Sequence, residues 1–167
     1  MSALSTTKTI RLGLKENWPQ FLLFFFINAL VGGLVGLERT IIPKYAEETF
    51  SITANTALLS FIIAFGISKS VTNYFTGKLY MQLGGRNLLI SGWLLAVPVP
   101  LLLLYALNWT YVIVANVLLG ISQGITWSCT VMMKIDLVGA RQKGLATGLN
   151  EFAGYVSVGF VAYLTAA

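Results

Sequence analysis

The 167-residue sequence contains no histidine, one cysteine (Cys129) and one aspartate (Asp136). The absence of histidine excludes zinc sites of the Cys₂His₂ type and hydrolases of the serine–histidine type. An aspartic dyad would need a second aspartate, and a lone cysteine cannot form an internal disulfide. We therefore expect no enzymatic activity, no metal site and no bound cofactor.

Charged residues are also scarce. They make up 10% of the sequence, whereas hydrophobic residues make up 56% and the mean hydropathy is +0.77. Because a soluble domain usually has about 25% charged residues, this composition excludes an ordinary cytosolic domain and predicts an integral membrane protein in a lipid bilayer. The net charge of +5 is explained by loops beside anionic lipid, so no nucleic-acid partner is expected.

Five apolar stretches are long enough to cross a bilayer, which takes about 20 helical residues. After an N-terminal segment of residues 1–17, they lie at about residues 18–42, 56–80, 88–107, 111–133 and 145–166. They lack the alternation of barrel strands, and their short connections make neighbouring helices antiparallel. The sequence therefore predicts an all-α bundle of five transmembrane helices over residues 18–167, with the third kinked at Pro98 and Pro100.

The basic residues predict the orientation of this bundle. If the N-terminus is inside, eight basic residues fall on the inner side and only two on the outer side. The eight are Lys8, Arg11, Lys15, Lys78, Arg86, Lys134, Arg141 and Lys143, and the two are Arg39 and Lys44. The positive-inside rule therefore places residues 1–17 in the cytoplasm.

Lys69 lies 13 residues into the second span, which is about 20 Å along the helix and too deep for its ammonium group to reach water easily. Thr72, Asn73 and Thr76 follow on the same side of the helix. This polar stripe predicts one wall of a hydrated cavity, and the alternative is a lysine satisfied by a neighbouring helix. Glu151 in the fifth span is either the counter-charge of Lys69 or a proton-carrying site.

Two other spans carry polar residues. The first ends in Glu38 and Arg39, which form either an interfacial pair at the outer boundary or a substrate gate. Gln123 and Trp127 share one flank of the fourth span and could contact a ligand or simply pack between helices. Glycines add close-contact positions, because Gly32 and Gly36 permit tight helix approach.

The short inner loop from Gly77 to Leu89 resembles the signature loop of the major facilitator superfamily. The matching residues are Gly77, Leu79, Gly84, Arg86 and Leu89, and Met81, Gln82 and Gly85 differ from the family pattern. In that family the loop's glycines allow a sharp turn and its charges hold the inner gate closed. The resemblance thus implies an inner-gate motif of Gly77, Gly84 and Arg86, together with Asp136 at the inner end of the fourth span.

The segment Gly120-Ile-Ser-Gln-Gly124 resembles the family's fourth-helix motif, with Gly120 in place of the arginine. The resemblance runs from Trp18 to Ala167 and corresponds to helices one to five of a twelve-helix fold. It therefore implies the N-terminal half of a major facilitator transporter as an incomplete six-helix bundle. Similar runs in bacterial members imply the inner (plasma) membrane of a bacterium.

These observations predict a secondary active transporter of small solutes that works by alternating access and is present as a truncated N-terminal portion. The expected substrate pathway comprises Glu38, Arg39, Lys69, Asn73, Gln123, Trp127, Asn150 and Glu151. The mid-membrane lysine favours an anionic substrate, and the coupling ion would be a proton or sodium. A missing C-terminal half or another subunit would be the partner. The alternative is a small non-transporting membrane protein that acts as an assembly or binding subunit.

Overall fold

The computed structural model of the chain describes residues 11–166, apart from the side chains of Thr56 and Ala57. Its elements are α1 (Trp18–Phe50), α2 (Asn55–Leu83), α3 (Gly85–Ala96), α4 (Pro98–Leu104), α5 (Trp109–Val138), the 3₁₀ turn η1 (Ala140–Gln142) and α6 (Lys143–Ala166). Within this part of the chain every regular element is helical. The predicted all-α fold is therefore confirmed.

The five predicted spans correspond to α1, α2, the pair α3 and α4, α5 and α6. Four of these five units are long and apolar enough to cross a membrane within the described residues, and they are Trp18–Phe50, Leu58–Leu83, Gly85–Leu104 and Trp109–Val138. α6 has 24 residues but is not among these four, and Asn150 and Glu151 interrupt its apolar sequence. Asn150 is buried in the bundle and Glu151 lines a hollow between helices, as described below.

The first helix is longer than predicted. α1 continues beyond residue 42, through Pro43, and ends only at Phe50. Ile42 and Ala46 are buried, and Ile42 packs against Phe61 of α2 and Val112 of α5. Packing of this apolar face therefore extends the helix past the end of the hydrophobic run.

The third span is broken into two helices, as the prolines predict. Pro98 has no backbone N–H, and α3 ends at Ala96 just before α4 begins. At the break, the Val97 N–H donates to the Leu94 carbonyl at 3.3 Å, which is the tighter turn of a 3₁₀ helix. The predicted kink is confirmed.

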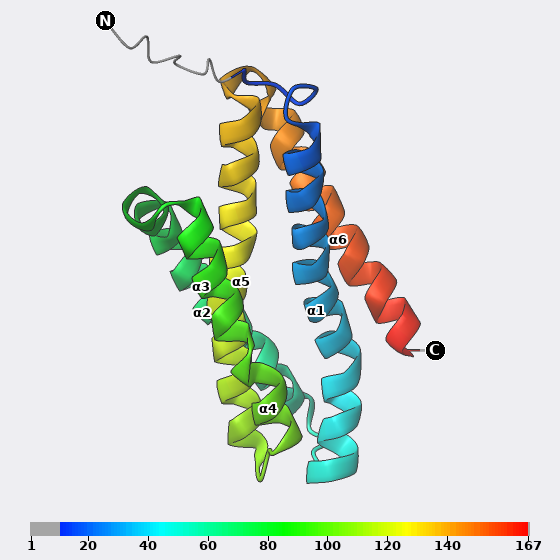
Figure 1. Ribbon diagram of the computed structural model, residues 1–167. Coiled ribbons are helices and arrows are strands. Elements are labelled where there is room, and N and C mark those ends of the chain that lie inside the picture. Colours follow the sequence, from blue (N-terminus) through cyan, green and yellow to red (C-terminus); the bar gives the residue numbers. More distant parts are fainter. Residues whose placement is uncertain (1–10, 167) are drawn as a thin grey trace, which may run out of the picture.

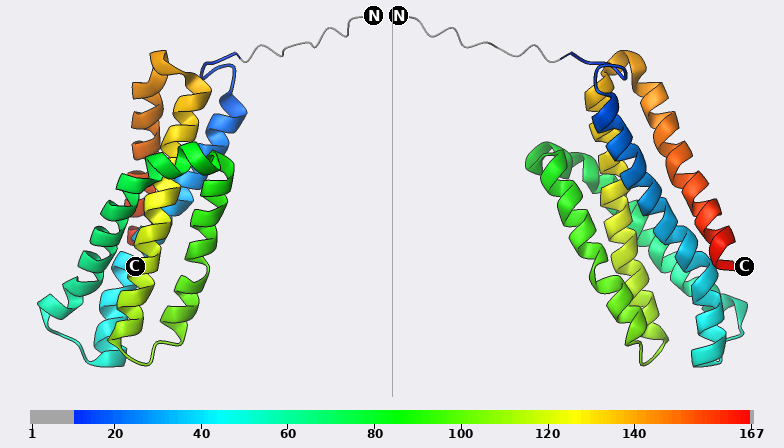
Figure 2. Two further views of the ribbon diagram at one scale, coloured as in Figure 1. Left: turned by 90° about the vertical axis from the view of Figure 1, so that its left-hand side faces the viewer. Right: turned by 45° about the vertical axis from the view of Figure 1, so that its right-hand side comes forward.

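α5 is the central helix of the bundle, and it contacts α1, α2, α3, α4 and α6 (Figure 1). α6 runs beside α1, on the other side of α5 from α3 (Figure 2). Two glycines of α5 allow α2 to approach closely: a Cβ at Gly120 would lie 2.6 Å from the Phe65 carbonyl oxygen, and one at Gly124 3.0 Å from the Lys69 carbonyl oxygen. The polar part of α2 is therefore held directly against α5.

The contact between α1 and α6 is equally close. A Cβ added at Gly32 would lie 2.2 Å from the Gly154 carbonyl oxygen, and one at Gly36 would lie 2.3 Å from the Val158 carbonyl oxygen. Neither position has room for a larger residue unless the two backbones separate. The close helix approach predicted from Gly32 and Gly36 is therefore confirmed, and α6 is its partner.

Candidate functional site

A hollow of about 420 Å³ opens between α2, α5 and α6. Its walls are mixed, with polar and charged groups beside apolar side chains. The lining residues are Lys69 and Asn73 of α2, Trp127, Ser128, Val131 and Met132 of α5, and Thr147, Glu151 and Tyr155 of α6. Four of the eight residues predicted for the substrate pathway thus lie around one space: Lys69, Asn73, Trp127 and Glu151.

Lys69 lies against aromatic rings. Its Nζ is 4.5 Å from the ring centroid of Trp127 and 5.5 Å from that of Phe65, which are cation–π distances. Glu151 acts on this ammonium group electrostatically, but among residues 11–166 the only salt bridge within 4.0 Å is Lys44–Glu48 at the surface. A direct ion pair of Lys69 with Glu151 is therefore not formed.

Glu151 is held by Trp127 instead. The indole Nε1–H donates to Glu151 Oε1 at 2.8 Å, and the Asn150 Nδ2 donates to the same oxygen at 3.3 Å. The Trp127 ring also contacts Tyr155 edge-on, with 5.4 Å between centroids. Trp127 is buried and Tyr155 is 67% exposed, so the aromatic wall runs from the interior of the bundle to its surface.

The polar stripe predicted on α2 is divided between two faces. Asn73 lines the hollow, where its Oδ1 accepts a hydrogen bond from Ser128 Oγ at 3.0 Å. Thr76 instead faces α5: it is buried and donates to carbonyl oxygens of Thr72 and Gly124. The prediction that all four residues form one cavity wall is wrong, because the close approach of α2 to Gly124 buries the threonine side.

Gln123 and Asn150 do not line the hollow. Gln123 is buried and its Nε2 donates to the Val31 carbonyl of α1 at 2.6 Å, which agrees with the packing alternative. Asn150 is fully buried behind Glu151, where the Asn28 Nδ2 of α1 donates to its backbone carbonyl at 2.7 Å. The amides of Gln123 and Asn28 therefore connect α1 to the helices that form the hollow.

Glu38 and Arg39 do not lie at the end of the first helix, because α1 continues for twelve residues beyond Glu38. Glu38 is 7% exposed and lines a separate apolar pocket of about 120 Å³, and its Oε1 has no hydrogen-bond partner in the structure. Arg39 points toward α2, with its guanidinium 5.3 Å from the ring centroid of Phe65 and 5.6 Å from that of Phe61. The first helix thus does not end at this pair, and both the interfacial and the gate alternatives stay predictions.

The residues predicted for the inner-gate motif form a turn but not a cluster of charges. Gly84 has φ +76°, in the region that favours glycine, and separates α2 from α3, whereas a Cβ at Gly77 would meet open space. Arg86 is exposed and makes no salt bridge among the described residues. Asp136 instead accepts a hydrogen bond from the Tyr80 hydroxyl at 2.5 Å, which joins α2 to the C-terminal end of α5.

Lys134 is the charged residue whose surroundings differ most from the sequence analysis. The positive-inside count places it among the charges on the inner side. Its side chain is instead fully buried in the bundle, where its Nζ donates to Asn150 Oδ1 at 2.6 Å. Lys134 follows Trp127 by seven residues, which is two helical turns and hence the same face. That spacing was the signal that could have placed it inside the bundle.

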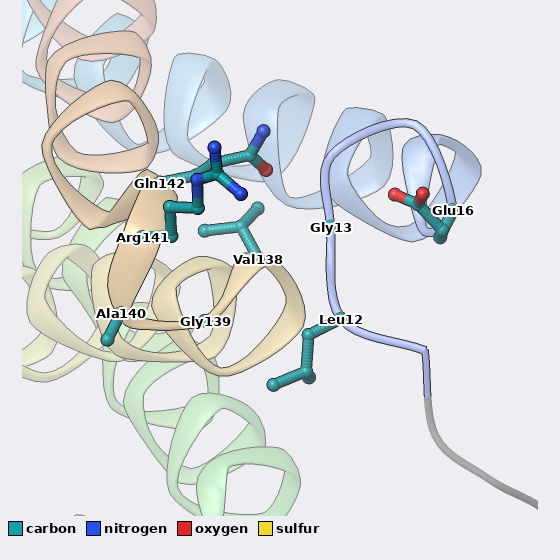
Figure 3. A pocket seen from close by; sticks show the side chains of 8 residues that line it. All are labelled: Leu12, Gly13, Glu16, Val138, Gly139, Ala140, Arg141 and Gln142. Carbon is teal, nitrogen blue, oxygen red and sulfur yellow. The ribbon is translucent and has the colours of Figure 1, made fainter.

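A second hollow of about 420 Å³ lies where the N-terminal segment crosses the turn between α5 and α6 (Figure 3). The Gly13 N–H donates to the Leu137 carbonyl at 3.1 Å, and the Leu14 N–H donates to Gln142 Oε1 at 2.9 Å. Asn17 Nδ2 lies within hydrogen-bond distance of three carbonyl oxygens, including that of Leu137 at 3.0 Å. The segment therefore closes the C-terminal end of α5.

The groups around the α2–α5–α6 hollow suit reversible binding. An ammonium group, a carboxylate, an indole and four side chains with hydroxyl or amide groups face a space open to the outside of the bundle. Within the described part of the chain, no group of three histidine, cysteine, aspartate or glutamate residues could hold a metal ion. The site can thus hold a small charged molecule through electrostatic and aromatic contacts.

A family model described as Major Facilitator Superfamily matches residues 21–167. The chain belongs to the major facilitator superfamily. Neither a search of curated proteins nor a search of solved structures gave a match. Membership makes the chain a transporter of the major facilitator type, which handles small molecules in a lipid bilayer, and the apolar helices agree with this assignment.

Proposed function

We propose that this major facilitator protein is a secondary active transporter that works by alternating access, and that the α2–α5–α6 hollow is part of its substrate pathway. The observation that carries the proposal is the convergence of Lys69, Trp127 and Glu151, from three helices, on one space. Ionisable groups inside a membrane are costly unless they serve a site or a partner. In secondary transporters such groups gather at the interface of two repeats, near the middle of the membrane.

The chemistry of the hollow favours an anionic substrate. The Lys69 ammonium group has aromatic neighbours but no carboxylate within salt-bridge distance among the described residues. An anion that enters the hollow would therefore meet a cation whose charge is only partly compensated. Glu151 stays beside the hollow without occupying it, because Trp127 and Asn150 hold its carboxylate.

A second bundle would complete the pathway. The hollow is open on its outer side, where Asn73 is exposed and Tyr155 is 67% exposed. We propose that another six-helix unit, supplied by a C-terminal half or by a separate subunit, covers this face. The two bundles would then rock about the site between them and expose it to each side of the membrane in turn.

Orientation, location and coupling are part of the same proposal. The excess of basic residues at the end of the bundle that holds Arg11, Lys15, Arg86 and Arg141 supports a cytoplasmic N-terminus, in the inner membrane of a bacterium. Transport would be driven by a proton or sodium gradient. Collapse of each gradient separately, with a protonophore or a sodium ionophore, identifies which ion is used.

The direct test is uptake of a panel of radiolabelled anions into cells in which the protein is expressed from its own locus. We expect Lys69→Ala to raise the apparent KM for the transported anion by about tenfold or more, since it removes the cation at the hollow. Lys44→Ala is the matched control, because Lys44 is a surface residue whose side chain is 77% exposed. Unchanged kinetics of Lys69→Ala across the panel would contradict the proposed role of this lysine.

The requirement for a second bundle has its own test. We expect the 167-residue chain to show no saturable uptake when it is reconstituted alone in liposomes, since nothing would then cover the open side of the hollow. Saturable uptake by the chain alone would contradict this part of the proposal.

A further inference from the structure

A buried polar network lies behind the hollow, between α1, α5 and α6. At its centre is Lys134, whose side chain is fully buried and whose Nζ donates to Asn150 Oδ1 at 2.6 Å. The same Asn150 oxygen lies 3.2 Å from Thr130 Oγ1, and the Asn150 amide nitrogen donates to Glu151 Oε1 at 3.3 Å. Asn150 therefore connects a buried ammonium group on one side to a carboxylate on the other.

The Glu151 carboxylate interacts with two lysines. Glu151 acts electrostatically on Lys69, which lines the hollow, and on Lys134, which is enclosed behind it. Among residues 11–166 neither lysine has a carboxylate within 4.0 Å. Aromatic rings contribute the remaining contacts, with Lys134 Nζ 5.7 Å from the ring centroid of Phe21 and 5.9 Å from that of Phe25. Two positive charges and one negative charge thus share this part of the bundle.

The neighbouring pair does not change this balance. Arg39 acts both on Glu38 and on Lys69, and because Glu38 and Arg39 carry opposite charges the pair as a whole adds no net charge. The group formed by Lys69, Lys134 and Glu151, here called the charge triad, keeps a net charge of +1. A buried charge without compensation is strongly unfavourable, so an occupant that brings one negative charge is favoured over a neutral or a doubly charged one.

We propose that the charge triad selects an organic anion with a single negative charge, and that Lys134 is the positioning and selecting residue that acts through Asn150 and Glu151. This inference rests on the proposed function of the hollow as an anion pathway. It adds a charge rule, namely that the bound anion carries a single negative charge. Lys134 itself does not line the hollow, so it does not touch the substrate. It retains Glu151 as its own counter-charge, which leaves Lys69 free to pair with the anion.

The walls of the hollow define the rest of the ligand. Trp127 and Tyr155 form an aromatic pair, and Val131 and Met132 add apolar surface. Such walls favour a flat or apolar body attached to the charged group. A benzene ring with different substituents is therefore a suitable set of probes: benzoate has one negative charge, terephthalate has two, and benzamide has none.

The test changes the net charge of the triad by substitution and measures which probe binds best. Equilibrium binding of the three radiolabelled probes is measured on the full chain, purified from its native membrane with any bound partner retained. Wild type is compared with Lys134→Met and Asn150→Asp, which both lower the net charge to zero, and with Glu151→Gln, which raises it to +2. Lys44→Met removes a charge of the same sign at the surface, where Lys44 is 77% exposed, and is the matched control.

We expect wild type and Lys44→Met to bind benzoate at least about tenfold more tightly than benzamide or terephthalate. Glu151→Gln should shift the preference toward terephthalate, and both Lys134→Met and Asn150→Asp should shift it toward benzamide. Asn150→Asp keeps the buried lysine and supplies it with a carboxylate, so a shift in both variants cannot come from a failure of Lys134→Met to fold. Circular dichroism and gel filtration check the fold of each variant.

Each outcome decides a different statement. If benzoate binds but its preference over benzamide is unchanged in Lys134→Met and Asn150→Asp, the role of Lys134 is wrong and the anion pathway stands. If wild type binds none of the three probes, the proposed anion pathway fails, and the charge rule fails with it.

Discussion

The indole Nε1 of Trp127 donates a hydrogen bond to Glu151 Oε1 at 2.8 Å and thereby joins α5 to α6 beside the hollow. Lys69 Nζ lies over the ring of the same tryptophan, 4.5 Å from the ring centroid. One side chain thus contacts both charged residues of the hollow, the carboxylate through its N–H and the ammonium group through its π system. Trp127 therefore keeps the two charges near each other without allowing them to pair.

This arrangement predicts the effect of Trp127→Phe. The variant keeps an aromatic ring but removes the N–H, so Glu151 retains only the longer hydrogen bond from Asn150. We expect the carboxylate to move toward Lys69 and the affinity for benzoate to fall about tenfold, since an ion pair would then occupy the anion's position. The measurement is the benzoate Kd, with Trp93→Phe in α3 as the control. An unchanged Kd would show that the N–H is not needed.

The end of the bundle that holds the turn between α2 and α3 depends on a different contact. Tyr80→Phe removes the hydrogen bond to Asp136, which joins α2 to α5. Because Asp136 is exposed, the expected loss is modest, about 0.5–1 kcal/mol in the free energy of unfolding. Arg86→Ala should have no measurable effect, since this exposed side chain makes no salt bridge in the described part of the chain. Unfolding in mixed micelles measures the free energy of unfolding of both variants. A larger loss for Arg86→Ala than for Tyr80→Phe would contradict this expectation and support an inner gate held by charges.

The contact between α1 and α6 predicts a strong effect of a single methyl group. In Gly32→Ala the new Cβ would lie 2.2 Å from the Gly154 carbonyl oxygen, so the two backbones must separate. We expect a loss of about 1–3 kcal/mol in the free energy of unfolding. Gly159→Ala in α6 is the matched control, because nothing lies within 4 Å of its Cβ position, and it should be neutral or slightly stabilising. Equal effects of the two substitutions would contradict the close packing.

The N-terminal segment should loosen when Asn17 is replaced. The Asn17 amide bonds to carbonyl groups of the segment and of Leu137, so Asn17→Ala leaves the segment attached chiefly through the Gly13 and Leu14 amides. We expect hydrogen exchange at these two amides to accelerate about fivefold, in proportion to a loss of roughly 1 kcal/mol of local stability. Glu16→Gln leaves these bonds intact and serves as the control. Unchanged exchange would mean that the segment is held by other contacts.

The helices could be predicted from the sequence because the apolar runs are long. The residues that interrupt them also end a helix for a chemical reason that the sequence shows. The third span shows this most clearly: Pro98 lacks a backbone N–H, and the helix breaks at Val97. The end of α1 could not be predicted from composition, because packing against other helices determines it. α1 continues to Phe50 because Ile42 and Ala46 are buried, and these tertiary contacts leave no trace in a hydropathy pattern.

The candidate site was predicted in part for a similar reason. Lys69, Asn73, Trp127 and Glu151 lie together, because an ionisable residue in a span marks a place that lipid does not cover. Gln123 and Asn150 are equally polar, but the sequence does not tell which neighbouring helix satisfies them. Lys134 was assigned to the inner side because a lysine near the end of a span usually reaches the water, and here Asn150 holds it inside.

The central claim is that Lys69 faces water inside the complete transporter and does not face lipid. Lys69→Cys and Ile67→Cys place thiols on the same helix two residues apart, and Ile67 is an apolar residue that is 63% exposed on the outer surface of the bundle. Both are made in a Cys129→Ala background, at the gene's own locus, and labelled in native membrane vesicles with an anionic, membrane-impermeant methanethiosulfonate. We predict that residue 69 reacts at least about tenfold faster than residue 67, since only a hydrated thiol ionises and meets the reagent. Equal rates, or no reaction at residue 69 from either side of the membrane, would contradict the account.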